Sequence, residues 1–110
     1  MTRTYETQQH CPVARSLDVL GDRWTLLVIR DLGLGRTKFG EFLDSLEGIS
    51  PNLLSDRLKR LEEATIVQRV FYSKHPPRAE YRLTEKGEAL RPVIEAIVAW
   101  GQRWEPQDAD

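Results

Sequence analysis

The sequence predicts a mainly α-helical domain with one small β-hairpin, an α+β arrangement. Apolar residues recur at helical spacing over most of the chain, and after Thr65 the pattern changes to β-branched and aromatic residues that alternate with polar ones. The 110 residues, 40% hydrophobic and 30% charged, suffice for one soluble domain with a single core. We therefore expect residues 10–104 to form this domain, between a flexible amino-terminal arm of residues 1–9 and a carboxy-terminal tail of residues 105–110.

Three helices are expected in the first half of the chain. Pro12 suits the first turn of a short helix that Gly21 would end. Residues 23–34 contain too many apolar side chains for one narrow face, which predicts a mostly buried second helix. The spacing of a short third helix is shown by Phe39, Phe42, Leu43 and Leu46. Gly48 can adopt the left-handed conformation that ends this helix.

A fourth helix is predicted to run from residue 50 to residue 64. Ser50 can cap its amino end by accepting a hydrogen bond from a free backbone amide, and Pro51 suits the first helical position. One face of this helix is apolar and holds Leu54, Leu58 and Leu61. The opposite face carries hydrogen-bonding side chains, namely Asn52, Ser55, Asp56 and Lys59.

Two strands, residues 66–72 and 79–83, are predicted from their β-branched and aromatic residues. Residues 73–78 would join them. This segment contains a His-Pro-Pro run that resists helix formation, and it is too long for a two-residue hairpin turn. We expect a projecting loop that carries Lys74 and Arg78.

The last helix is expected to be the longest. Thr84 could cap its amino end. One continuous apolar stripe along it consists of Leu90, Val93, Ile94, Ile97, Trp100, Gly101 and Trp104. This stripe offers more apolar surface than a helix over one small domain readily covers.

This order of elements, with a tight turn between the third and fourth helices, is typical of a winged helix-turn-helix. In that architecture one helix fits the major groove of DNA, the helix before it braces the backbone, and a basic hairpin reaches the neighbouring groove or phosphates. The net charge of −1 does not indicate a polyanionic partner such as DNA, so any basic surface must be confined to one part of the chain. Residues 57–82 contain seven basic and three acidic residues, which supplies such a surface.

Short motifs in one register extend over nearly the whole domain. In chain order they are Cys11-Pro12-Val13, residues 21–27 (GDRWTLL), residues 48–51 (GISP), residues 54–62 (LSDRLKRLE), and PPR, EY and LTEKG within residues 76–87. Together they resemble the HxlR family of bacterial transcriptional regulators. The resemblance implies a homodimeric winged helix protein that binds operator DNA, with dimer contacts made by the first and last helices.

Thr65 departs from the family pattern. Members of that family often have glycine at this position, which lets the chain leave the fourth helix through a residue with positive φ. We therefore expect the end of that helix to be strained or shaped differently in this chain.

The predicted DNA-binding residues fall into three groups, and the partner they imply is a double-stranded, roughly palindromic operator. On the fourth helix, base contacts are expected from Asn52, Ser55 and Lys59, and phosphate contacts from Ser50, Arg57 and Arg60. The hairpin would contribute Lys74, His75 and Arg78. Thr37 and Lys38, ahead of the third helix, are further candidates for phosphate contact. The alternatives are a solvated helix face, an ordinary polar turn and, for Arg57, pairing with an acidic neighbour.

The apolar residues of the first and last helices predict a twofold dimer. Operator half-sites repeat about 34 Å apart and pair naturally with such a dimer. The predicted interface consists of Val13, Leu17, Leu90, Val93, Ile94, Ile97, Trp100 and Trp104. Packing against the first two helices of the same chain is the alternative for part of the stripe.

Cys11 is a candidate redox switch. It stands just before a helix that Pro12 opens, and the partial positive charge at a helix amino end stabilises a thiolate and raises its reactivity. The resemblance to the HxlR family also implies a candidate role for this residue, because several members sense electrophiles or oxidants through a cysteine at this place. Several other members do not. With no second cysteine in the chain, oxidation would give a sulfenic acid, a mixed disulfide or a bond between two copies of Cys11. The alternative is a buried structural thiol. The effector that a redox switch implies is an oxidant or another small molecule.

Other function classes find little support in the sequence. No apolar run approaches the about 20 residues that a membrane helix needs, and the amino terminus does not resemble a signal peptide, so we expect a cytoplasmic protein. One cysteine and two histidines cannot complete the usual zinc site, and no cofactor is expected. A thiol enzyme built on Cys11 with His10 or His75 as base lacks a water-excluding cleft, so no enzyme is predicted. A winged helix that binds protein instead of DNA remains the alternative.

Overall fold

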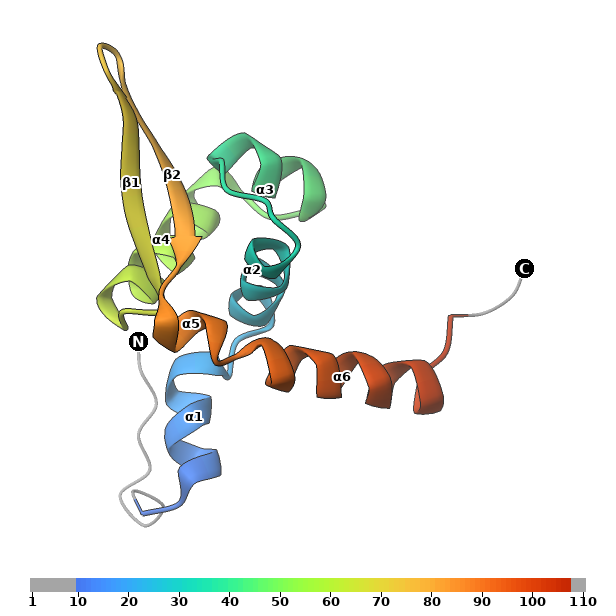
Figure 1. The fold of residues 1–110 in the computed structure, drawn as a ribbon. Coiled ribbons are helices and arrows are strands. Elements are labelled where there is room, and N and C mark those ends of the chain that lie inside the picture. The colour runs from blue at the N-terminus through green and yellow to red at the C-terminus, as the bar shows by residue number, and fades with distance from the viewer. Residues whose placement is uncertain (1–9, 108–110) are drawn as a thin grey trace.

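A computed structural model describes residues 10–107 of the chain. The predicted order of helices and hairpin is confirmed, with one additional short helix (Figure 1). The elements are α1 (Pro12–Leu20), α2 (Arg23–Gly33), α3 (Phe39–Ser45), α4 (Pro51–Glu63), β1 (Val67–Lys74), β2 (Pro77–Leu83), α5 (Glu85–Glu88) and α6 (Arg91–Trp104). The predicted arm of residues 1–9 and the end of the predicted tail lie outside the described residues.

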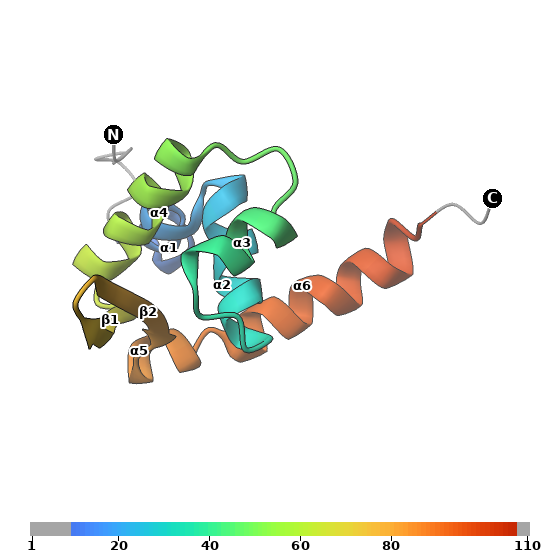
Figure 2. The ribbon, with the colours of Figure 1, turned by 90° about the horizontal axis from the view of Figure 1, so that it is seen from above.

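The core lies between α2, α3, α4 and the start of β1, which gather into one body in Figure 2. Its buried apolar residues are Val28, Ile29, Leu32, Phe42, Leu46, Ile49, Leu54, Leu58, Leu61, Ile66 and Val67. α2 contributes three of these and lies at the centre, as its composition predicted. Asp22 caps α2 by accepting hydrogen bonds from the amides of Trp24 (2.8 Å) and Thr25 (3.2 Å).

α1 and α6 leave this core as two arms (Figure 1). Neither helix contains a buried residue, although both are amphipathic. The winged helix-turn-helix is therefore a compact body of α2, α3, α4 and the hairpin, with α1 and α6 projecting from it.

The β-hairpin turns more tightly than the sequence predicted. The strands extend to Lys74 and Pro77, which pair with each other, so His75 and Pro76 alone form the turn, with a cis peptide bond between them. The expectation of a loop over residues 73–78 was wrong. Both strands of a two-stranded sheet are edge strands. Pro77 can therefore be the first residue of β2, because no ladder hydrogen bond there requires the N–H that proline lacks. The Ser73 hydroxyl donates to the Pro76 carbonyl at 2.9 Å and closes the turn.

The predicted last helix is divided into two. Thr84 caps α5, by accepting a hydrogen bond from the amide of Gly87 at 3.2 Å, and does not cap the long helix. Pro92 lacks the N–H that a continuous helix would need for a bond to the carbonyl four residues earlier, so the chain ends α5 and begins α6 at Arg91. The predicted single helix from Thr84 onward was wrong, although α6 remains the longest helix of residues 10–107.

Two residues take the left-handed conformation at the predicted places. Gly48, in the turn between α3 and α4, has φ = 93°, which glycine adopts without strain. Thr65, just after α4, has φ = 59°. For a residue with a Cβ atom this conformation costs about 1 kcal/mol, so the expectation of a strained helix end is confirmed.

Candidate nucleic-acid interface

α4 is fixed at its amino end and along one face. Ser50 accepts a hydrogen bond from the amide of Leu53 at 3.1 Å, so it caps the helix as predicted. Leu54, Leu58 and Leu61 are buried in the core. A helix held in this way presents its opposite face to solvent in one defined orientation.

The opposite face of α4 carries Asn52, Ser55 and Lys59, which we call the recognition face. All three side chains are exposed. Among the described residues they have no hydrogen bond or ion pair, so their donors and acceptors are available to an outside partner. Amide, hydroxyl and ammonium groups on an exposed helix are suited to the edges of bases in a major groove.

Arg57 points away from this face. Its guanidinium donates to Asp22 Oδ2 at 2.9 Å and also pairs with Asp56, and only 13% of its side chain is exposed. The hydrogen bond from Arg57 lowers the pKa of the Asp22 carboxyl, and the same bond raises the pKa of Arg57. Thus the structure shows the acidic pairing that was the alternative for Arg57, and it ties α4 to the amino end of α2.

Arg60 and Asp56 form an exposed pair on the rim of α4, with 3.0 Å between Arg60 Nε and Asp56 Oδ2. The paired arginines offset the carboxylate of Asp56, which would otherwise repel phosphate. Arg60 remains half exposed, so it can reach a phosphate beside the recognition face.

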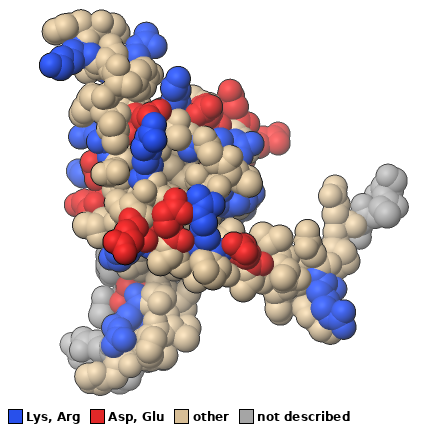
Figure 3. Space-filling view, in the orientation of Figure 1, with Lys and Arg blue, Asp and Glu red and all other residues tan. Residues whose placement is uncertain are grey.

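The hairpin, which we call the wing, carries positive charge at its end. Lys74, His75 and Arg78 are all exposed there and form the wing tip. Figure 3 shows blue side chains at the far end of the hairpin, away from the red groups near its base. No ion pair of the wing tip occurs within the part of the chain that the structure describes.

Thr37 and Lys38 lie against the middle of the wing. The Thr37 carbonyl accepts a hydrogen bond from the amide of Tyr81 at 2.7 Å, and the Thr37 hydroxyl donates to Glu80 Oε2 at 3.3 Å. The ammonium of Lys38 lies 5.1 Å from the centre of the Tyr72 ring. Thr37 and Lys38, which were predicted to contact phosphate, therefore both contact the wing.

Glu80 and Glu41 hold this junction and were not predicted as functional residues. Glu80 accepts a hydrogen bond from Arg82 Nε at 2.9 Å, and the bonds from Arg82 lower the pKa of Glu80. Glu41 accepts from the amides of Thr37 (3.0 Å) and Lys38 (2.9 Å), which lowers the pKa of Glu41. A glutamate three residues after a helix start is a recognisable capping signal, whereas no local pattern identifies Glu80.

Asp31 is a second feature that the sequence did not reveal. Its carboxylate is fully buried, with Arg30 Nη2 at 2.8 Å and Arg36 Nη1 at 3.6 Å from Oδ1, and Oδ2 has no hydrogen-bond partner among the described residues. The two arginines are partly exposed at the surface. The buried carboxylate thus holds two cations near the loop that precedes α3.

Cys11 is exposed and occupies the cap position of α1. The predicted dimer residues divide into two groups. Leu90 and Ile94 pack partly against the chain's own core. The exposed group consists of Val13, Leu17, Val93, Ile97, Trp100 and Trp104.

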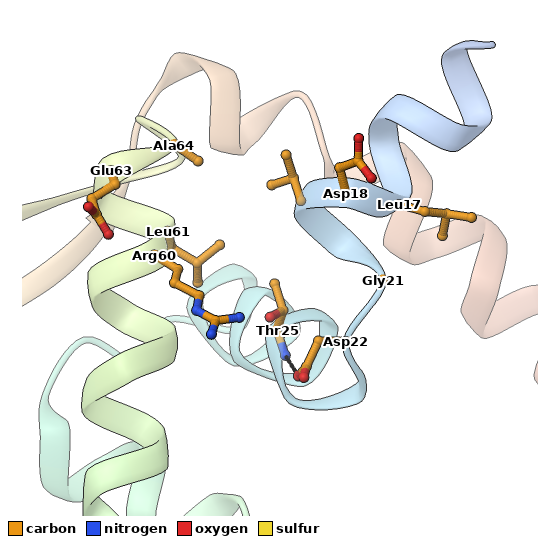
Figure 4. A pocket seen from close by; sticks show the side chains of 10 residues that line it. Leu17, Asp18, Gly21, Asp22, Thr25, Arg60, Leu61, Glu63 and Ala64 are labelled. Carbon is orange, nitrogen blue, oxygen red and sulfur yellow. Dashed lines mark hydrogen bonds between the residues drawn. The ribbon is translucent and has the colours of Figure 1, made fainter. Parts of the chain in front are cut away.

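Among the hollows on the surface of residues 10–107, two lie between helices. One of about 760 Å³ lies between the α1–α2 junction and the carboxy-terminal half of α4, where Figure 4 shows Asp18 and Asp22 on one side and Arg60 and Glu63 on the other. The second is an apolar groove of about 430 Å³ between the end of α2 and α6. In residues 10–107 no cluster of three or more metal-binding side chains occurs. No helix in the same range has the length and apolar character to cross a membrane.

Known proteins match this chain over most of its length. The model of the HxlR-like helix-turn-helix family matches residues 19–109. The HTH-type transcriptional regulator sll1512 of Synechocystis is 38% identical over 105 residues, which cover 96% of this chain and 78% of that protein.

Two solved structures of regulators are also similar. The reduced form of the transcriptional regulator YodB from B. subtilis has a TM-score of 0.73 at 39% identity and covers 89% of this chain and 98% of that chain. The redox regulator HypR in its oxidized form has a TM-score of 0.80 at 34% identity and covers 90% of this chain and 100% of that chain.

Proposed function

The chain belongs to the HxlR-like helix-turn-helix family and is a DNA-binding transcriptional regulator, and from this premise we propose that it binds a twofold operator as a homodimer. The recognition face of α4 contacts base edges in the major groove. Ser50 and Arg60 contact phosphates beside it, and the wing tip contacts the flanking backbone. Arg57 takes the role of a structural link to Asp22, since its guanidinium is paired with the carboxylates of Asp22 and Asp56.

The observation that carries this proposal is the recognition face. Asn52, Ser55 and Lys59 are exposed and free on a helix whose other side is buried to between 0 and 1% exposure at Leu54, Leu58 and Leu61. A buried apolar side fixes the helix, and a free polar side leaves it ready to read a groove.

The apolar arms support the homodimer. Trp100 and Trp104 are 61% and 58% exposed, and Ile97 and Val93 lie on the same side of α6. In a twofold dimer, the equivalent side chains of the second copy would cover these side chains. Two recognition faces would then be presented at the spacing of adjacent major grooves, about 34 Å.

The test is a titration of the chain against DNA from around its own coding region, at two salt concentrations. The expected result is a discrete complex whose affinity falls steeply with salt, because lysines and arginines displace counterions from phosphates. Lys59→Ala should weaken the complex by about 1 to 3 kcal/mol, the usual range for a base-reading side chain. Lys86→Ala, which removes the same side chain and charge from α5, outside the recognition face, the wing tip and the proposed interface, is the matched control and should leave the affinity nearly unchanged. An affinity indifferent to salt would favour the protein-binding winged helix.

A second function, response to oxidants, is favoured by Cys11. It is exposed at the amino end of α1, and the redox regulator HypR is among the similar structures. We propose that oxidation of Cys11 to a mixed disulfide or to a bond between two copies alters DNA binding. Diamide should release the complex, and Cys11→Ser should abolish this response without changing the affinity of the reduced protein. A complex that diamide leaves intact would remove the redox function and keep the regulator.

A further inference from the structure

We propose that Thr37 and Glu80 are positioning residues that hold the wing at a fixed angle to α3 and α4, so that Lys74 and Arg78 reach the DNA backbone. This role rests on the proposed DNA-binding function of α4 and the wing. It assigns Thr37 a task other than the direct phosphate contact that its place in the sequence predicted.

The middle of the wing is attached to the rest of the molecule from several directions. Along the open edge of β2, the amide of Tyr81 donates to the Thr37 carbonyl at 2.7 Å. On the core side, the Tyr81 ring meets the Phe42 ring edge-on, with 6.5 Å between the ring centres. These two contacts fix the position of β2 near the end of the strand that enters the core.

The side chains of Thr37, Glu80 and Lys38 add contacts that resist tilting of the wing. The Thr37 hydroxyl donates to Glu80 Oε2 at 3.3 Å, and Arg82 Nε donates to Glu80 Oε1 at 2.9 Å. Only 16% of the Glu80 side chain is exposed. Lys38 reaches the ring of Tyr72 on β1, 5.1 Å from its centre. Both strands of the wing are therefore joined to the two residues that precede α3.

The length of the wing makes this junction sensitive. Glu80 lies four positions from Pro76 in the turn, a distance of about 13 Å at about 3.3 Å per residue. A tilt of about 10° at Glu80 would move the wing tip by about 2 Å. A formed hydrogen bond spans only about 2.7 to 3.2 Å, so such a tilt would draw Lys74 and Arg78 out of their best geometry and weaken their contacts with phosphate.

The sign of the effect at Glu80 distinguishes positioning from plain electrostatics. Glu80→Ala removes a negative charge, and a protein that merely repels DNA there would bind more tightly. If Glu80 positions the wing, the same change weakens binding. It also lowers the slope of log affinity against log salt by about 2, because each lost phosphate contact removes about 0.9 from the slope. Hydroxyl-radical footprints should lose the protection at the operator flanks and keep it at the centre.

Thr37→Val is the second variant, and it exchanges one uncharged side chain for another of similar shape. It should lower the salt slope in the same direction as Glu80→Ala, which a lost direct contact from a neutral hydroxyl cannot do. Thr37→Ser keeps the donor and should restore the affinity and the slope. Thermal unfolding of each variant identifies any that fail to fold, and Thr37→Val supplies the result if Glu80→Ala is one of them.

A double-mutant cycle completes the test. Lys74→Ala with Arg78→Ala should weaken binding in the unchanged chain and have a smaller effect beside Thr37→Val, because the tilted wing tip then contacts the DNA backbone less closely. Additive effects with unchanged salt slopes would overturn the positioning role and leave the DNA-binding function intact. If the unchanged chain forms no salt-sensitive complex on any DNA tested, the proposed function fails and the positioning role fails with it.

Discussion

α4 and α6 carry the same kind of apolar stripe, but the fold treats the two helices in opposite ways. Leu54, Leu58 and Leu61 of α4 are 0 to 1% exposed, whereas Ile97 and Trp100 of α6 are 49% and 61% exposed. An amphipathic pattern therefore predicts that a face will be buried and does not say which chain buries it. For α4 the partner is α2 of the same chain, and for α6 we propose a second copy.

The largest expected effect is on the α4 side of this comparison. Leu58→Ala should lower the free energy of unfolding by about 3 kcal/mol, because it leaves a cavity in a packed core. Urea unfolding at several protein concentrations measures it, and the loss should be the same at each. A loss below about 1 kcal/mol would show that α4 is less firmly packed than its burial indicates.

Ile97→Asp tests the α6 side. A charge at the centre of the proposed interface should give monomers in analytical ultracentrifugation and weaken operator binding by about 100-fold, since one half-site no longer supports the other. Gln102→Asp, which adds the same charge to the side of α6 that faces the groove beside α2, serves as the control on the same helix. A dimeric Ile97→Asp protein of unchanged affinity would refute the proposed interface.

Asp22→Asn examines the link between α4 and the amino end of α2. Asparagine keeps the helix cap and loses the charge that pairs with Arg57, so at pH 7 we expect a loss of stability of about 1 kcal/mol. The paired state lowers the pKa of Asp22, so its contribution is complete above the ordinary aspartate pKa of about 4 and is lost as the pH falls through the lower folded value. Unfolding measured at pH 7, 5 and 3 should therefore show the variant and the unchanged chain converging toward acid. A constant difference would contradict the ionic link.

Thr65→Gly is expected to have the smallest effect. Glycine relieves the strain of φ = 59° and gives up conformational entropy, so the net gain in stability should be at most about 1 kcal/mol. Thermal unfolding checks this, and Gly48→Ala is the reciprocal change, which should destabilise because Gly48 has φ = 93°. A less stable Thr65→Gly protein would mean that the bond from the Thr65 hydroxyl to the Ala64 carbonyl outweighs the strain.

The predicted recognition face shows how far sequence patterns reach. The Ser50 cap, the buried leucines of α4 and the exposure of Asn52, Ser55 and Lys59 all agree with the predictions, because caps and helix faces depend on residues within a turn of one another. The break between α5 and α6 was missed even though Pro92 marks it locally, since the apolar stripe continues across it.

Contacts between distant residues were decided by the tertiary structure. Arg57 turns inward to Asp22, 35 positions earlier, and the Thr37 hydroxyl binds Glu80, 43 positions later. Neither pairing leaves a periodic or capping signal, because each depends on how separate elements pack together. The sequence by itself determined which segments form helices and strands and which faces of them are polar. Only the packing of α2, α3 and the wing decided which charged and hydroxyl groups hold the protein together and which remain free for DNA.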